Sequence, residues 1–256
     1  MGTIPITIIS FLFGTVWGSF FYTLALRYAD GSMSYKPLKA LFSRSRCPAC
    51  EKEISPLMLV PIFGYIIQKG KCGNCGSTIS SWYPTVEVMY GALSALFVWN
   101  LGPTIYSFNL YLLASVALCI AIVDIKTLTI PDSLVISFFL LSIYPIILNY
   151  NLRDNLFGLA SLFAVFIVIL LLFPGSFGGG DVKLASAIGL LSGLEQSIVV
   201  LEVSLVTGAL VGILYALKTK KNLRTKIPFA PFLAVGLIIS LLWGRDILLV
   251  YFRILY

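Results

Sequence analysis

Two aspartates, Asp124 and Asp181, are candidates for catalysis because of their carboxylates and their positions in the sequence. Each lies at the edge of a long uncharged stretch, Asp124 in VDIKTLTIPD and Asp181 in GGGDVK, and each has a lysine two residues later. An ionisable side chain at the edge of membrane hydrocarbon is costly and is therefore a candidate for function. Two carboxylates can hydrolyse a peptide bond when one is ionised and activates water while the other is protonated and polarises the carbonyl. From these residues alone, simple solvation at the membrane interface explains the pair equally well.

The composition indicates that these aspartates belong to a membrane protein with many spans. Hydrophobic residues make up 59% of the 256 positions and charged residues 11%, and the mean hydropathy is +0.96. Soluble domains do not have this composition. The chain has no histidine, which excludes Ser-His-Asp and Cys-His nucleophilic sites and HExxH metalloprotease sites. A carboxylate pair is the hydrolytic chemistry that remains.

Eight apolar stretches could cross a bilayer, and we expect them to be helices. Their apolar runs are continuous, whereas the strands of a barrel would alternate apolar with polar residues. The first stretch is too long, and its start too uncharged, for a cleavable signal peptide. The predicted spans are residues 4–26, 85–101, 105–123, 133–150, 155–173, 182–194, 197–217 and 227–243.

The basic residues predict the orientation of these spans. With eight crossings, 15 of the 18 lysines and arginines fall on one side, in residues 27–84, in the two aspartate loops and in residues 218–226. The positive-inside rule assigns that side to the cytoplasm and the N-terminus to the outside. Anionic lipid then accounts for the positive charge, and no nucleic-acid partner is expected.

Four cysteines between the first two spans predict a metal site. Cys47 and Cys50 form one CxxC pair, Cys72 and Cys75 form another, and 21 residues separate the pairs, as in zinc ribbons. Four thiolates suit tetrahedral zinc, and without histidine a mixed site is excluded. Two disulfides are the alternative, but they require an oxidising compartment and conflict with the cytoplasmic side.

Residues beside the aspartates have simpler expected roles. Asp132 precedes the predicted span at 133–150, and we expect it to cap that helix. Glycines 178, 179 and 180 would let the chain turn tightly before Asp181 and approach a substrate strand closely. Lys126 and Lys183 would either extend toward lipid headgroups or lower the pKa of an aspartate, and the sequence leaves both roles open.

The order of the motifs resembles the type IV prepilin peptidases, which are leader peptidases and N-methyltransferases of pilus, type II secretion and competence systems. The resemblance runs nearly end to end. It is carried by GSFFYTLALR, RCPAC, GKCGNCG, WYPTVE, VDIKTLTIPD, FGGGDVKLASAIG and IPFAPFLAVG in this order. The two aspartate blocks together with the cysteine quartet are highly specific, whereas GxGD alone would also fit presenilin-like and signal-peptide-peptidase enzymes.

The resemblance implies an intramembrane aspartic peptidase of the bacterial inner membrane, with Asp124 and Asp181 as the catalytic pair. The substrate would be a prepilin or pseudopilin with a short basic leader, cut at the cytoplasmic membrane edge. The new N-terminus would then be methylated with S-adenosylmethionine. Arg27 and Glu87 are candidates for the methyl-transfer side, although both could instead anchor spans at the interface.

The expected architecture is therefore an all-α membrane protein with three parts. Residues 1–26 form the first span, residues 27–84 a cytoplasmic zinc-binding domain, and residues 85–256 the peptidase domain. Three other functions remain open: a transporter that uses the aspartates as ion ligands, a non-catalytic component that binds pilin helices, and a GxGD protease without methyl transfer.

Overall fold

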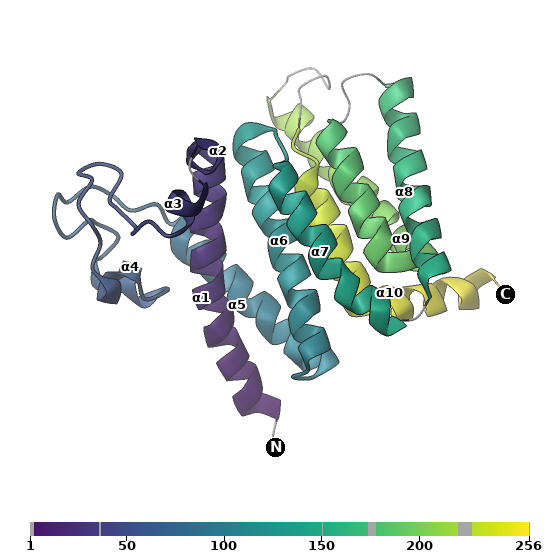
Figure 1. Cartoon of the computed structure of the whole chain (residues 1–256), viewed down its shortest axis with the longest axis horizontal. Helices are drawn as coiled ribbons and strands as arrows, with labels where there is room; N and C mark the ends of the chain where they lie inside the picture. Colours follow the sequence, from purple (N-terminus) through teal and green to yellow (C-terminus); the bar gives the residue numbers. More distant parts are fainter. Residues whose placement is uncertain (1–2, 36, 150, 174–177, 220–226, 256) are drawn as a thin grey trace. The chain divides into compact units, whose positions relative to one another are not determined.

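The computed structural model describes residues 3–35, 37–149, 151–173, 178–219 and 227–255, and the regular structure in these ranges is helical (Figure 1). The predicted all-helical architecture, with a four-cysteine cluster after the first helix, is confirmed. The elements are α1 Thr3–Ala29, α2 Ser32–Tyr35, α3 Pro37–Leu41, the 3₁₀ helix η1 Pro56–Leu59, α4 Phe63–Ile67, α5 Trp82–Leu101, α6 Ile105–Thr127, α7 Asp132–Asn149, α8 Leu152–Leu172, α9 Gly179–Thr219 and α10 Ala230–Leu255.

The chain divides into two compact units, residues 1–111 and 112–256. In the first unit, α1 packs closely against α5 because small residues face each other. A Cβ on Gly14 would lie 2.7 Å from the Tyr90 carbonyl oxygen, and one on Gly91 would lie 2.8 Å from Thr15. Small residues at such contacts let two helix backbones approach, which is how apolar helices pack without a hydrophobic driving force in lipid.

The second unit is built around α9, which packs against α7, α8 and α10. α9 is broken at Gly193, where the backbone has φ 73 and ψ 178, so that it consists of two helices. Figure 1 shows the second half running back toward the end of the unit where the first half begins. This agrees with the two separate spans that we predicted at 182–194 and 197–217.

Side chains of α8 satisfy the backbone groups that the break in α9 leaves without helical partners. The Asp154 carboxylate accepts the Leu194 N–H at 3.1 Å, and the Asn155 amide donates to the Leu190 carbonyl at 2.7 Å. Such compensation is required at a helix break in a membrane. Neither Asp154 nor Asn155 belongs to the motifs described above.

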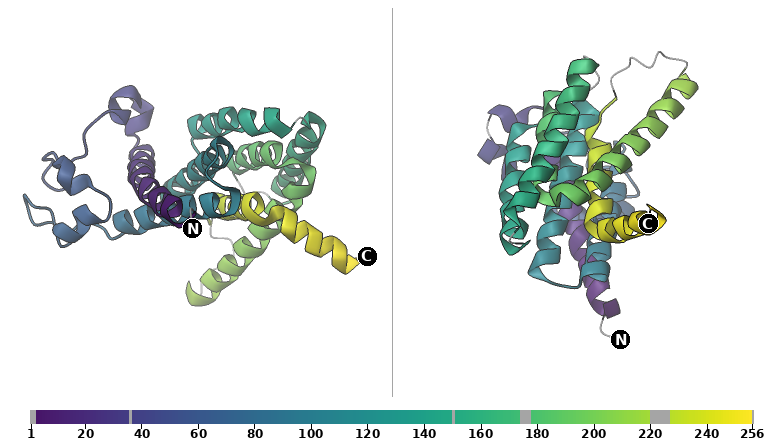
Figure 2. Two further views of the ribbon diagram at one scale, coloured as in Figure 1. Left: turned by 90° about the horizontal axis from the view of Figure 1, so that it is seen from below. Right: turned by 90° about the vertical axis from the view of Figure 1, so that its right-hand side faces the viewer.

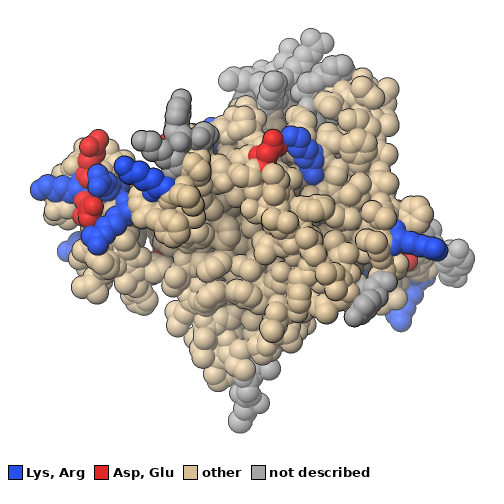
Figure 3. Space-filling view, in the orientation of Figure 1, with Lys and Arg blue, Asp and Glu red and all other residues tan. Residues whose placement is uncertain are grey.

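Six of the described helices are long and apolar enough to cross a membrane, namely α1, α6, α7, α8, α9 and α10. The break in α9 divides one of the six into two. α5 is not among them because Tyr83, Pro84 and Glu87 lower the hydropathy of its first half. On the face drawn in Figure 3, the sides of the helices are largely uncharged, as a membrane protein requires.

Within the second unit, four chain segments that carry or flank the aspartate motifs reach the same end. They are the end of α6, the start of α7, the start of α9 and the start of α10, as Figures 1 and 2 show. Most of the basic cluster predicted at 218–226 lies outside the described residues.

Candidate active site and metal centre

Asp124 lies in the last turn of α6 and is 5% exposed, and its carboxylate is held by the beginning of α10. The Ala230 N–H donates to Asp124 Oδ2 at 3.1 Å, and the Phe229 N–H also donates to this carboxylate. The first N–H groups of a helix have no partner inside it, and the helix dipole favours an anion there. The beginning of α10 therefore fixes the orientation of Asp124.

Asp181 lies in the first turn of α9, is 8% exposed and has one carboxylate oxygen available for chemistry. Its Oδ2 accepts the Gly178 N–H at 2.8 Å, which fixes the side chain on its own loop. Its Oδ1 is buried and has no hydrogen-bond partner among the described residues. A buried acceptor without a partner is costly, and water or a substrate group can satisfy it.

The two aspartate motifs meet through direct contacts. A Cβ on Gly180 would lie 2.9 Å from the Ile130 Cβ, so that only glycine lets the start of α9 pack against the α6–α7 loop. The Asp124 and Asp181 carboxylates are near enough to interact electrostatically. The structure thus brings together the two aspartates that we predicted from sequence, and it gives Gly180 a packing role that we had not predicted.

An exposed ion pair also joins the two motifs. Lys183 Nζ donates to Asp132 Oδ1 at 2.7 Å, with side chains that are 58% and 66% exposed. Asp132 is the first residue of α7, whereas we had expected it to precede the helix. Lys183 is thus paired with Asp132 across the two motifs.

The four predicted cysteines converge in the first unit. Their sulfur atoms all lie within 4.8 Å of one another, a spacing that fits one tetrahedral metal ion. The Ser77 hydroxyl lies 3.6 Å from Cys47 Sγ and 3.1 Å from Cys75 Sγ. Hydrogen bonding from Ser77 lowers the pKa of Cys47 to about 6 and also lowers the pKa of Cys75, which favours the thiolates that bind metal.

Two similar turns present the cysteines. In the first, Cys47 N–H donates to the Lys52 carbonyl at 3.0 Å; in the second, Cys72 N–H donates to the Ser77 carbonyl at 2.8 Å. An antiparallel bridge flanks each turn, one from Arg46 to Glu53 and one from Lys71 to Thr78. This repeat follows directly from the two CxxC motifs.

Arg27 and Glu87 contact the connecting segments of the first unit. The Arg27 guanidinium donates to the carbonyls of Ala40, Leu41 and Ser43, with distances of 2.5 to 3.1 Å. Glu87 is 6% exposed and accepts the Ile62 N–H at 2.7 Å. Both side chains therefore bind backbone groups in the segment between α1 and α5.

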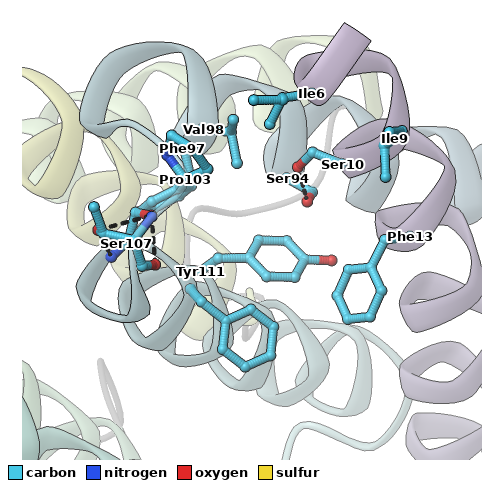
Figure 4. A pocket seen from close by; sticks show the side chains of 12 residues that line it. Ile6, Ile9, Ser10, Phe13, Ser94, Phe97, Val98, Pro103, Ser107 and Tyr111 are labelled. Carbon is cyan, nitrogen blue, oxygen red and sulfur yellow. Dashed lines mark hydrogen bonds between the residues drawn. The ribbon is translucent and has the colours of Figure 1, made fainter. Parts of the chain in front are cut away.

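A cavity of about 310 Å³ lies elsewhere in the first unit, between the beginning of α1, the end of α5 and the beginning of α6 (Figure 4). Its lining is mostly apolar, and the hydroxyls of Ser10 and Ser94 lie 2.7 Å apart on its wall. It has no ionisable side chain suited to hydrolysis and is therefore not a candidate active site.

Comparison with known families divides the chain much as the structure does. Residues 12–101 match the bacterial Peptidase A24 N-terminal domain, and residues 111–213 match the type IV leader peptidase family. The two matches nearly coincide with the two compact units, whose boundary falls after residue 111.

Several curated proteins are similar over most of their length. The chain is 33% identical over 247 residues to a prepilin leader peptidase/N-methyltransferase of Bacillus subtilis, covering 96% of this chain and 97% of that protein. It is 32% identical over 219 residues to one of Pseudomonas aeruginosa, covering 82% and 74%. No solved structure matches the chain.

Proposed function

Because the chain belongs to the type IV prepilin leader peptidase/N-methyltransferase family, whose peptidases are aspartic, we propose that Asp124 and Asp181 are the catalytic pair that cleaves prepilins. The observation that carries this assignment is the buried Oδ1 of Asp181, which has no hydrogen-bond partner among the described residues, near the oriented carboxylate of Asp124. The chain has no histidine that could act as general base in their place.

Cleavage would then follow the chemistry of two cooperating carboxyl groups. The ionised carboxylate accepts a proton from water, and the resulting nucleophile forms a bond with the scissile carbonyl carbon. The protonated partner donates its proton to the carbonyl oxygen. Breakdown of the tetrahedral intermediate transfers a proton to the departing nitrogen, which breaks the peptide bond and regenerates one ionised and one protonated carboxyl group.

The place of the pair at one end of the helices suits a prepilin. A basic leader in the cytoplasm and an apolar segment in the bilayer would put the scissile bond at the membrane edge. The distribution of basic residues supports this orientation, with the N-terminus outside and both aspartates at the cytoplasmic side of the bacterial inner membrane.

The cysteine cluster would hold a structural zinc ion. Cys47, Cys50, Cys72 and Cys75 fit it by number and sulfur spacing, and hydrogen bonds from Ser77 lower the pKa of the Cys47 and Cys75 thiols. A bound zinc would tie the two turns together, since a short segment without a large core gains much of its stability from a metal. The zinc would have no part in peptide hydrolysis.

The second activity would be methylation of the N-terminal amine released by cleavage, with S-adenosylmethionine as co-substrate. The free amine would attack the methyl carbon, forming an N–C bond as the C–S bond breaks. S-adenosylhomocysteine would leave, and the methylated ammonium would then lose a proton. The N-methyltransferase part of the relatives' names supports this step. Arg27 and Glu87 remain candidates for supporting it through the backbone segments that they hold.

One experiment tests both activities. The purified protein is incubated with a prepilin, with and without S-adenosylmethionine, and the N-terminus of the product is identified by mass spectrometry. We expect cleavage in both reactions and methylation only with the co-substrate. Normal cleavage by Asp124→Asn or Asp181→Asn would refute the catalytic pair, and an unmethylated product would identify a peptidase without methyl transfer.

A further inference from the structure

The segment between the two cysteine turns has the composition of a membrane surface rather than of a soluble domain. Residues 54–68 carry no charge, although charged residues border them on both sides. An apolar stretch of this length is too short to cross a bilayer and is found in buried core helices and in interfacial or re-entrant segments. Its large side chains are exposed: Leu57 76%, Leu59 40%, Val60 42%, Phe63 59%, Ile66 61% and Ile67 63%.

The segment lies beside the apolar part of α1. The Ile62 N–H is bonded to Glu87, and the Glu87 Cα would lie 3.1 Å from a Cβ on Gly18 of α1. Gly18 precedes Arg27 by nine residues, or about 13 Å along a helix. Figure 1 shows α4 level with the middle of α1 rather than beyond its end. Along the axis of α1, the segment therefore lies level with the apolar residues of this helix and not beyond its end.

The backbone of the segment is bonded internally, as entry into a bilayer requires. The Gln68 amide donates to the Met58 and Gly64 carbonyls at 3.3 and 2.9 Å. Pro56 and Pro61 have no N–H to satisfy. Several backbone groups of the segment are thus satisfied within it, while its large apolar side chains are exposed.

One strained residue fixes this arrangement. Ile62 has φ 65, which is unfavourable for a β-branched residue, and the Phe63 N–H closes a γ-turn onto the Pro61 carbonyl at 2.6 Å. The buried Glu87 carboxylate holds the N–H of this same residue. Strain of this kind persists only where surrounding contacts fix it, and here those contacts keep η1 and α4 beside α1 and α5.

Basic side chains follow the apolar face directly. Lys69 and Lys71 are exposed at its end. Apolar side chains next to lysines are the combination by which surface segments bind anionic lipid, because the apolar groups enter the interface while the ammonium groups bind phosphate.

We propose that residues 56–67 form a lipid-docking surface that inserts into the interface of an anionic bilayer and fixes the cysteine turns against the membrane. The occupant is the lipid of the surrounding leaflet. This surface is separate from the aspartate pair, and its existence depends neither on peptide cleavage nor on methyl transfer.

Photocrosslinking in a bilayer tests the proposal. The full chain is placed in nanodiscs of phosphatidylglycerol and phosphatidylcholine with the photoreactive residue p-benzoylphenylalanine at position 63, at position 66 or, as a control, at position 78. Phe63 and Ile66 lie on the apolar face, whereas Thr78 is an exposed residue of the second cysteine turn. Adducts are identified by mass spectrometry after illumination.

We expect phospholipid adducts at positions 63 and 66 at least about tenfold above those at position 78, enriched in phosphatidylglycerol over its share of the bilayer. Crosslinks from 63 and 66 to other helices of the chain, or to an added pilin, would show that a protein covers the face and would overturn the proposal. Equal lipid labelling at all three positions would also overturn it.

Discussion

The cysteine cluster and the aspartate pair are assembled over very different distances along the chain. The cysteines come from two turns separated by 21 residues, and each turn is closed by its own backbone hydrogen bonds. Asp124 and Asp181 come from two different helices, and Asp124 is oriented by Ala230, which is 106 residues away. We therefore expect the cysteine cluster to lose its structure when the metal is lost, and the aspartate pair to lose its geometry when the packing of its helices changes.

Loss of the metal is the change with the largest expected effect. Zinc contributes on the order of 10 kcal/mol to the folding of small tetrathiolate sites. The double variant Cys47→Ser, Cys72→Ser should lose zinc binding. It should also lose the protection from hydrogen exchange of the backbone amides at positions 72 and 76. Zinc content and hydrogen exchange measured by mass spectrometry check this, with Cys119→Ala in α6 as the control that keeps the metal.

The same experiment tests whether the two regions are independent. The Ala230 amide, which binds Asp124, should keep its protection after the metal is lost. Equal loss of protection at Ala230 would show that the aspartate pair depends on the cysteine centre, and the comparison of local with distant assembly would then be wrong.

Removal of one catalytic carboxylate should have the next largest effect, and only on cleavage. Asp181→Asn keeps the size of the side chain but removes the acid–base pair, so cleavage should fall by at least about 10³-fold. Methylation of a pilin that has already been cleaved should change by less than about threefold. Both are measured by mass spectrometry of the pilin N-terminus.

The control for this variant is Asp246→Asn, which alters an exposed carboxylate of α10 outside both aspartate motifs. It should leave both activities unchanged. A parallel loss of cleavage and methylation in Asp181→Asn would indicate a single shared site and would contradict the separation of the two activities.

The difference between the regions also explains what the sequence could predict. The convergence of the four cysteines was predictable, because CxxC spacing and turn chemistry are local. The aspartates themselves could be found because each interrupts an apolar stretch. Their supporting contacts could not be found. Ile130 and Ala230 both lie in quoted motifs, but the sequence does not indicate that Ile130 packs against Gly180 or that the Ala230 N–H binds Asp124.

The helices show the same limit. Hydropathy gave the approximate positions of α1, α6, α7, α8 and α10 and of the separate halves of α9, whereas α5, predicted as a span at 85–101, is not among the described helices that are apolar enough to cross a membrane. The break at Gly193 and the α8 residues that satisfy it, Asp154 and Asn155, depend on contacts between helices. Glu87 was noticed as a charge near a membrane edge, but its contact with Ile62 depends on a strained turn that hydropathy does not reveal.

A change in helix packing should affect the aspartate pair moderately. A Cβ on Gly189 would lie 2.3 Å from the Gly158 carbonyl oxygen, so Gly189→Ala must separate α8 from the half of α9 that carries Asp181. Such overpacking costs about 1–3 kcal/mol, and cleavage should fall because Asp181 moves. Thermal unfolding in detergent and the cleavage assay measure the two effects.

Gly212→Ala, in the second half of α9, is the control. Among the described residues, a Cβ there would meet Ile227 Cδ1 alone, at 3.7 Å, which is an ordinary contact. Because alanine favours helix over glycine by roughly 0.5–1 kcal/mol, this variant should be slightly stabilised and fully active. Equal behaviour of the two variants would mean that the Gly158–Gly189 contact does not position Asp181.

The ion pair between Lys183 and Asp132 should have the smallest effect, although it joins the two aspartate motifs. Both side chains are more than half exposed, so water and salt screen their attraction, and such pairs contribute about 0.2–1 kcal/mol. A double-mutant cycle of Lys183→Met and Asp132→Asn should give a coupling free energy in this range that decreases as salt is added, with cleavage altered less than about fivefold. If Lys183 acted instead on Asp181, Lys183→Met would shift the pH dependence of cleavage whereas Asp132→Asn would not. The 2.7 Å contact with Asp132 argues for matching pH profiles in the two variants, because each substitution removes the same pair and leaves both catalytic carboxylates in place.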